Sequence, residues 1–261
     1  MTILRAALIP VVLLSYVLLA VPAEWLAARR PPSARGWLSP SLARLLLALL
    51  RIRVEASGLD ALRAGTLVVA NHVSWIDILV IASLRPVRFL AKAEVGAWPI
   101  VAAIARAQGA IFVDRARRRS ILPANAAIRR ALAAGDVVVV FPEGTTGPGD
   151  GVLPFRSSHL QPACDAPRGT RRVAALALRY DDPRAAWVGD ATLPPHLWEM
   201  LRAPRSVCRL VFAAPRELAP ACCRKRLARQ MQDEVARRLT MLERRSVSPS
   251  PSRSSPPPCP S

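Results

Sequence analysis

The chain has 261 residues, of which 52% are hydrophobic, and its 37 Lys and Arg against 18 Asp and Glu give a formal net charge of +19. A chain of this length can bury a substantial core, so a largely disordered basic protein is excluded. Strong positive charge combined with high hydrophobicity is typical of a protein that sits on an anionic lipid surface. Charge alone leaves nucleic-acid binding open as the alternative.

Residues 1–30 predict a membrane anchor helix. The segment from Ala6 to Pro22 has no charged residue, and as a helix it would rise about 25 Å against a hydrocarbon core of about 30 Å. Continuation to Ala28 would complete a crossing. A cleaved signal peptide is the competing interpretation, because Arg5 precedes the apolar run.

The arginines after this segment favour an anchor over a signal peptide. Basic clusters hold the chain that follows a span in the cytoplasm, so the rest of the protein is predicted to be cytoplasmic, on the inner or plasma membrane. These residues are Arg29, Arg30, Arg35, Arg44, Arg51 and Arg53.

Residues 31–55 predict an amphipathic helix at the membrane interface. Leu42, Leu45, Leu46 and Leu49 recur at helical spacing within residues 38–50. Such a helix would lie in the interface with its flanking arginines on lipid phosphates. A helix that packs into the protein core is the alternative.

Residues 56–245 predict one α/β domain, because short apolar runs typical of buried strands alternate with helix-like stretches. This alternation indicates a mixed sheet flanked by helices. The predicted strands are 66–70, 87–91, 109–113, 136–141, 173–178 and 207–212, and the predicted helices are 74–83, 97–107 and 121–134. Residues 217–245 predict one or two basic helices, whose charge would also dock on anionic lipid.

Residues 246–261 hold thirteen Ser or Pro in sixteen positions and predict a disordered tail. The five cysteines are scattered, without the paired spacing of a zinc site or a disulfide framework, and none lies near a histidine at ligand spacing. The sequence therefore predicts a reducing compartment and no structural metal.

Asn71, His72 and Asp77 directly follow the predicted strand 66–70, in the sequence NHVSWID. In a regular helix His72 and Asp77 would point in different directions, so they can meet only if His72 lies in the turn before the helix. Asp77 would then fix one imidazole nitrogen and leave the other free to take a proton. A histidine that only bonds a loop carbonyl is the alternative.

The place of this pair favours the catalytic interpretation, since open α/β sheets expose their ligand crevices at the carboxyl ends of strands. No Ser or Cys stands in the context of a nucleophile elbow. The pair must therefore activate a nucleophile that belongs to a substrate, either an alcohol or water.

Two further predicted strands also end in polar residues. GAIFVDR ends in Asp114 and Arg115, and a guanidinium at a strand end could bind a phosphate with two hydrogen bonds. VVVVFPEGTTG leads through Glu143, Gly144 and Thr145, which could accept substrate hydroxyls or hold a phosphoryl group. Three successive strand ends thus predict a single crevice with a base and an anion site.

The sequences NHVSWID, GAIFVDR and FPEGT resemble the first three sequence blocks of the glycerolipid acyltransferases, the 1-acylglycerol-3-phosphate acyltransferase family. The stretch AKAEVGAWPI, which contains Lys92, is similar to the segment between the first two blocks of that family, and FRSS after the third block also fits. The resemblance covers about Gly65 to Tyr180. The fourth block departs from the family pattern, because RRVAALALRY lacks the usual proline.

The resemblance implies that His72 is a general base and Asp77 its orienting partner. It also implies a substrate-binding set made of Asn71, Lys92, Arg115, Glu143, Gly144 and Thr145. The implied reaction transfers an acyl group from acyl-CoA or acyl carrier protein to the hydroxyl of a lysolipid. The expected acceptor is 1-acyl-sn-glycerol-3-phosphate, giving phosphatidic acid, with a lyso-ornithine lipid as the alternative.

The expected reaction needs no cofactor or metal, and its partners are membrane lipids and the two substrates. Three rival functions remain to be tested. A hydrolase would use the same base to activate water, and a membrane scaffold would carry the motifs without activity. A nucleic-acid-binding protein is disfavoured, because aromatic residues make up only 5% of the chain and the apolar N-terminus has no use there.

Overall fold

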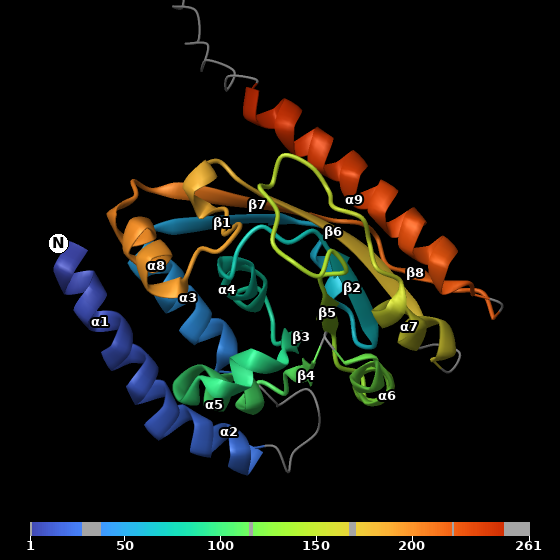
Figure 1. Ribbon diagram of the computed structural model, residues 1–261, viewed down its shortest axis with the longest axis horizontal. Helices are drawn as coiled ribbons and strands as arrows, with labels where there is room; N and C mark the ends of the chain where they lie inside the picture. The colour runs from blue at the N-terminus through green and yellow to red at the C-terminus, as the bar shows by residue number, and fades with distance from the viewer. Residues whose placement is uncertain (1, 28–37, 115–116, 167–170, 221, 248–261) are drawn as a thin grey trace, which may run out of the picture.

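The computed structural model describes residues 2–27, 38–114, 117–166, 171–220 and 222–247. A single mixed sheet organises the molecule (Figure 1), in the strand order β1, β7, β6, β2, β5, β3, β4, with β8 paired to β6. The strands are β1 (Ile52–Ser57), β2 (Thr66–Ala70), β3 (Arg88–Lys92), β4 (Ile111–Val113), β5 (Val138–Val140), β6 (Arg172–Tyr180), β7 (Ser206–Phe212) and β8 (Arg216–Glu217). β6 runs antiparallel to β7 and β8, and the other pairs are parallel. The predicted mixed α/β sheet is confirmed.

Helices cover both faces of this sheet. They are α1 (Thr2–Ser15), which continues through a π-helical segment (Tyr16–Ala20) into α2 (Val21–Ala27), then α3 (Ser39–Leu50), α4 (Ile76–Ala82), α5 (Pro99–Ala107), α6 (Ile121–Ala133), α7 (Gln161–Asp165), α8 (Leu193–Arg202) and α9 (Arg224–Val247). Successive residues of one strand point to opposite faces. Val68 of β2 therefore lies in the core with α1, α3, α4 and α8, whereas Leu67 and Val69 lie in the core with α6, α7 and α9.

The N-terminal helix lies along the body of the protein. Residues Thr2–Ala23 form the one helix, among the described residues, that is long and apolar enough to cross a membrane by length and composition. Ile9 and Tyr16 are buried against the body, and Arg5 donates hydrogen bonds to the carbonyls of Leu49 and Leu201 at 3.1 and 2.6 Å. The opposite side of the helix is apolar and exposed, as the exposed fractions of Leu4 (64%) and Leu18 (62%) show.

The helix predicted near residues 38–50 is present as α3, and its apolar stripe lies in the core. Leu42, Leu46, Leu47 and Leu50 are buried there, whereas Leu45 is 46% exposed. This packing corresponds to the core-helix alternative. The segment predicted as interfacial, 31–55, also contains the start of β1, because α3 ends at Leu50 and Arg51 turns the chain with φ 60°. Its first residues, 31–37, lie outside the described part of the chain.

Four elements were absent from the predicted pattern: β1, the short α7, α8 and the short β8. α9 begins at Arg224 and continues to Val247, so the helix extends two residues into the predicted tail; residues 248–261 lie outside the described residues. The structure also pairs Cys164 with Cys222 in a disulfide. The prediction of scattered, unpaired cysteines is wrong here, because α7 and the approach to α9 meet on one face of the sheet across 58 residues of sequence.

Candidate active site

The turn between β2 and α4 brings His72 and Asp77 together. β2 ends at Ala70 and α4 begins at Ile76, so His72 lies in irregular backbone and Asp77 in the first helical turn. The His72 Nδ1 atom is 2.7 Å from the Asp77 Oδ2 atom. Asp77 is fully buried and the His72 side chain is 16% exposed. The pair therefore has the predicted geometry, with Nδ1 fixed by the carboxylate, while Nε2 has no hydrogen-bond partner among the described residues.

Asp77 has four hydrogen-bond donors around it. Besides His72, its Oδ2 atom accepts from the main-chain N–H groups of Val73 and Ser74 at 2.8 and 3.0 Å. Its Oδ1 atom accepts from the Tyr180 hydroxyl at 2.8 Å. Burial, followed by the nearby charge of Asp77, raises the pKa of Tyr180 well above its ordinary value. The phenol thus remains a donor, and the carboxylate cannot rotate without losing these bonds.

The face of the His72 ring is fixed by a second contact. Phe141, which follows β5, stacks on the imidazole with ring centroids 4.0 Å apart and planes 15° apart. Because β5 and β2 are parallel neighbours, their carboxyl ends lie at the same edge of the sheet. Stacking and the Asp77 bond together leave the imidazole one orientation.

Glu143 supports the main chain around His72. Its Oε2 atom accepts from the His72 N–H and its Oε1 atom from the Leu153 N–H, both at 3.1 Å. Glu143 is 5% exposed. Burial raises the pKa of Glu143 from 4.5 to about 7, against the lowering effect of these two hydrogen bonds and with a small contribution from the charge of Asp77. Both carboxyl oxygens are therefore used within the protein.

Asn71 joins two strands. Its side-chain amide donates to the Leu178 carbonyl at 3.0 Å and its side-chain carbonyl accepts from the Leu178 N–H at 2.9 Å. The residue is 1% exposed. The amide thus continues the pairing of β2 with β6 by one residue beyond Ala70, and places the turn that carries His72.

Known proteins resemble this chain in both sequence and fold. The family model described as Acyltransferase matches residues 53–176. A lyso-ornithine lipid O-acyltransferase from Rhizobium meliloti (strain 1021) is 38% identical over 213 residues, which cover 76% of this chain and 73% of that protein. Its counterpart from Brucella abortus (strain 2308) is 32% identical, over 89% of this chain and 92% of that protein. This chain belongs to the acyltransferase family.

One further relative and one solved structure of the same fold carry the name that the motifs suggested. A 1-acyl-sn-glycerol-3-phosphate acyltransferase from Neisseria meningitidis serogroup B (strain ATCC BAA-335 / MC58) is 34% identical over 66% of this chain and 68% of that protein. The crystal structure of the 1-acyl-sn-glycerophosphate acyltransferase from Thermotoga maritima matches with a TM-score of 0.65 at 20% identity, covering 98% of this chain and 100% of that chain. The resemblance predicted from three sequence blocks is confirmed, and the chain is an acyltransferase enzyme.

Of the remaining predicted site residues of this acyltransferase, three lie at or beyond the carboxyl ends of the neighbouring parallel strands β3 and β5. Gly144 follows Glu143 with φ 79°, a conformation that favours glycine. Thr145 is exposed. Lys92 ends β3, with its side chain 56% exposed and its Nζ atom 3.0 Å from Glu94. Arg115 lies outside the described residues. Among the described residues, no group of three or more His, Cys, Asp or Glu could hold a metal ion.

Two loops of the acyltransferase adjoin the turn that carries His72. Gly147 donates its N–H to the His72 carbonyl at 2.8 Å, and Trp187 donates its N–H to the Val73 carbonyl at 2.9 Å. The Thr146 hydroxyl donates to the Trp187 carbonyl, which ties the two loops to each other. We call these two segments, 144–153 and 184–190, the site loops.

His196 of α8 also supports the turn that carries His72, although the sequence did not indicate it. Its Nδ1 atom lies 3.0 Å from Trp75 Nε1, and its Nε2 atom lies 3.1 Å from the Arg184 carbonyl. Because an indole N–H only donates and a carbonyl only accepts, these contacts require a neutral imidazole that carries its proton on Nε2. Tyr180 was missed as well, and the signal available for it was its position at the end of a strand beside β2.

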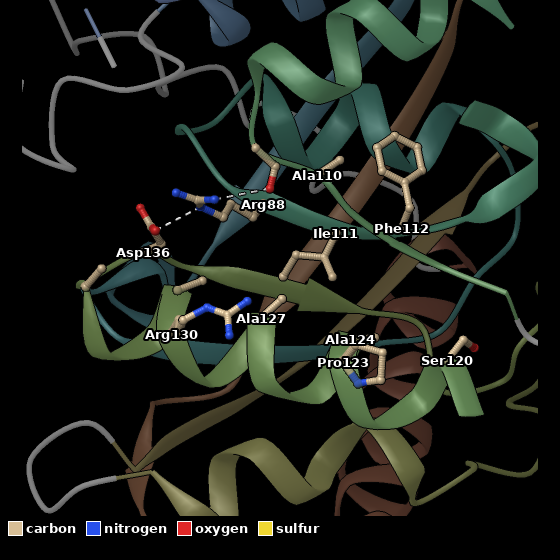
Figure 2. Close-up of a pocket in the computed structure, with 13 residues that line it drawn as sticks. Arg88, Ala110, Ile111, Phe112, Ser120, Pro123, Ala124, Ala127, Arg130 and Asp136 are labelled. Atoms are coloured by element: carbon tan, nitrogen blue, oxygen red, sulfur yellow. Dashed lines mark hydrogen bonds and ion pairs between the residues drawn. The ribbon is translucent and has the colours of Figure 1, made fainter. Parts of the chain in front are cut away.

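A cavity of about 610 Å³ lies apart from the dyad, between the edge strand β4 and α6 (Figure 2). Alanines of α6 line one side, and Arg88 and Asp136 form an ion pair of 2.8 Å at one end. Arg88 and Asp136 stand at the amino ends of β3 and β5, whereas the dyad stands at the carboxyl end of β2. None of the residues that line the cavity belongs to the dyad.

Proposed function

We propose that the chain is a membrane-attached lysolipid O-acyltransferase, which moves a fatty acyl group from an acyl thioester to the free hydroxyl of a lysolipid. The observation that carries the proposal is the His72–Asp77 pair, which is held at the edge of the sheet and whose Nε2 atom has no partner in the described part of the chain. The family and the names of the relatives support it.

The chemistry follows from the position of the proton acceptor. The lysolipid hydroxyl attacks the thioester carbonyl while its proton passes to His72 Nε2, and Asp77 stabilises the imidazolium that forms. A new C–O bond forms, the C–S bond breaks, and the thiolate leaves with the proton from the imidazolium. Proton transfer of this kind accelerates reactions by about 10² to 10⁴. Every proton is accounted for, so the proposed transfer needs no cofactor.

For the acceptor we propose a lyso-ornithine lipid. The relatives from Rhizobium meliloti and Brucella abortus, which align over 76% and 89% of this chain, bear that activity in their names. The second candidate is 1-acyl-sn-glycerol-3-phosphate, which the name of the Neisseria meningitidis relative supports. In that case Arg115 is proposed as a phosphate contact, and Lys92, Gly144 and Thr145 as the rest of the acceptor site. Glu143 and Asn71 act through the main chain that they hold.

Attachment to the membrane is proposed to use the exposed apolar side of the N-terminal helix. The catalytic domain would then lie on the cytoplasmic side, in keeping with the basic residues that follow the helix. An acceptor that is itself a membrane lipid would reach the site from the same bilayer.

The test is a reaction with purified chain in vesicles, labelled acyl donor and each lysolipid in turn, with the products identified by mass. We expect the diacyl product of the true acceptor, and a loss of about a thousandfold in kcat for His72→Ala with an unchanged melting temperature. Release of free fatty acid without any acceptor would favour the hydrolase instead. A fully active His72→Ala variant would overturn the proposal.

A further inference from the structure

The N-terminal helix turns its charged residue toward the protein. Arg5 is the only charged residue of the sequence from Thr2 to Ala23. It lies four residues before Ile9, which is seven residues before Tyr16, so the three side chains lie on one side of the helix. Ile9 and Tyr16 are buried in the core that α3, α4 and α8 share. A charge is costly in an apolar helix that meets lipid, and the inward direction of Arg5 avoids that cost.

Arg5 holds the ends of two other helices. Its guanidinium donates to the carbonyl of Leu49, in the last turn of α3, at 3.1 Å. It also donates to the carbonyl of Leu201, in the last turn of α8, at 2.6 Å. The last carbonyls of a helix have no partner within the helix, and the helix dipole favours a cation there. One side chain of α1 therefore fixes the end of α3 relative to the end of α8 (Figure 1).

From its buried side, α8 reaches the turn that carries the dyad. His196 is 5% exposed. Its Nδ1 atom accepts from the indole N–H of Trp75 at 3.0 Å, and its Nε2 atom donates to the Arg184 carbonyl at 3.1 Å. Trp75 lies between the two residues of the dyad in the chain and directly precedes α4. Both nitrogens of this buried imidazole are therefore used to hold parts of the site in place.

A second set of bonds leads from His196 to the carboxylate of the dyad. The carbonyl that His196 bonds belongs to the site loop 184–190. In the same loop, the Trp187 N–H donates to the Val73 carbonyl at 2.9 Å. The Val73 N–H donates in turn to Asp77 Oδ2 at 2.8 Å. The helix α8 thus holds the turn at two points, and the N-terminal helix holds α8.

We propose that Arg5 and His196 are positioning residues for the acyl transfer, and that they act together through α8 on the turn that carries His72. The N-terminal helix then completes the active site in addition to attaching the protein to lipid. This inference rests on the proposed function. Neither residue is proposed to touch a substrate, so the loss of either should lower kcat and leave KM unchanged. A misplacement of about 1 Å in the reacting groups can cost about a hundredfold in rate.

The first experiment separates hydrogen bonding from packing at position 196, with the purified full chain in detergent micelles. A glutamine amide accepts and donates as a neutral imidazole does, whereas phenylalanine fills the space without a polar atom. We expect His196→Phe to lower kcat about tenfold, with both KM values within about twofold, and His196→Gln to keep kcat within about threefold of wild type. Trp75→Phe removes the same bond from its other end and should lower kcat about as much as His196→Phe. A His196→Phe protein at least as active as His196→Gln would overturn the proposal, because the residue would then act by packing alone.

The second experiment concerns Arg5, again in micelles, so that attachment to vesicles does not limit the rate. Arg5→Gln removes the cation from both helix ends, and we expect it to lower kcat about tenfold with both KM values within about twofold. Arg85→Gln is the control, because Arg85 donates to the Leu62 carbonyl at 3.2 Å beyond the far end of α4 and should leave kcat unchanged. Sedimentation of Arg5→Gln with vesicles should match wild type, since the exposed apolar side is intact. A wild-type kcat for Arg5→Gln in micelles would overturn the proposal.

A double-mutant cycle tests whether the two residues act together. If both act through α8 on one turn, Arg5→Gln/His196→Phe should lower kcat about ten- to thirtyfold, which is less than the product of the two single losses, about a hundredfold. A loss equal to that product would overturn the joint action. The melting temperature of each variant is measured so that kcat refers to folded protein. The proposed function fails separately, if no donor and acceptor give product with wild type.

Discussion

Asp77 holds His72 through a network in which one residue, Tyr180, comes from more than a hundred positions further along the chain. The network fixes the orientation of the Asp77 carboxylate and of the His72 ring, and it supplies no atom that reacts. In the proposed reaction we expect the network to stabilise the transition state most, because the positively charged imidazolium forms there beside the carboxylate.

We expect Tyr180→Phe to lower kcat about tenfold, because the Asp77 carboxylate loses a hydrogen bond that holds its orientation. The KM of both substrates should stay within about twofold, because Tyr180 is not proposed to contact a substrate. The measurement is a kcat and KM series in vesicles. The chain's other tyrosine provides the control. Tyr16→Phe removes the hydroxyl of a buried tyrosine in the N-terminal helix and should leave kcat unchanged. A larger change in KM than in kcat would contradict the positioning role.

Glu143 gives a pH dependence to folding. Its pKa rises from 4.5 to about 7, so between these values the folded chain binds more protons at this group than the unfolded chain. Its contribution to the free energy of unfolding is therefore complete below about pH 4.5 and lost as pH rises through 7, a difference of about 3 kcal/mol at most.

In Glu143→Gln we expect this pH dependence of the free energy of unfolding to disappear. The measurement is the free energy of unfolding of both proteins from denaturant titrations between pH 5 and 8. As pH rises, the free energy of unfolding of wild type should fall relative to that of the variant. A difference that stays constant with pH would contradict the raised pKa.

At the scale of elements, the turn after β2 depends on the Asn71 side-chain amide, which bonds the main chain of β6 where the backbone pairing of β2 ends. Asn71→Leu would leave the Leu178 N–H and carbonyl buried without partners, and we expect it to lower the free energy of unfolding by about 2 to 4 kcal/mol. Asn125→Leu is the control, because Asn125 bonds the Ser158 carbonyl in a partly exposed place and should cost about 1 kcal/mol. Equal losses in chemical denaturation would contradict the assignment.

The strands of the catalytic edge were predictable because they are buried on both faces and read as unbroken apolar runs. TLVVA is β2 with the predicted bounds, and the predicted run 173–178 lies within β6. β1 was missed because Arg53 and Glu55 interrupt its apolar residues. α8 was missed because His196 and two prolines obscure its apolar periodicity, although Met200 and Leu201 are buried.

The part of the site that lies within one local turn was predictable from the sequence. The contacts between strands that are distant in sequence were not. His72 and Asp77 are five residues apart, so spacing alone limited their geometry. Asn71 and Glu143 were expected to touch substrate, but Asn71 bonds the main chain of Leu178 and Glu143 bonds the main chain of His72, both far along the sequence. No pattern within one segment reports such partners, because strand order decides them.

At the scale of the whole molecule, one surface is apolar and exposed. We expect Leu4→Asp/Leu18→Asp to reduce partitioning into anionic vesicles about a hundredfold, since two leucines would no longer be buried in lipid. Leu59→Asp/Leu122→Asp alters two exposed leucines elsewhere and should leave partitioning unchanged. Sedimentation with vesicles measures both, and equal behaviour of the two variants would contradict attachment through the N-terminal helix.

The two site loops reach the catalytic turn through main-chain bonds, from Gly147 to the His72 carbonyl and from Trp187 to the Val73 carbonyl. Main-chain bonds do not depend on which side chains the loops carry. Much of the sequence of these two loops is therefore free to change while the dyad keeps its geometry. The loops around His72 can thus diverge in sequence during evolution without any step at which the His72–Asp77 pair is lost.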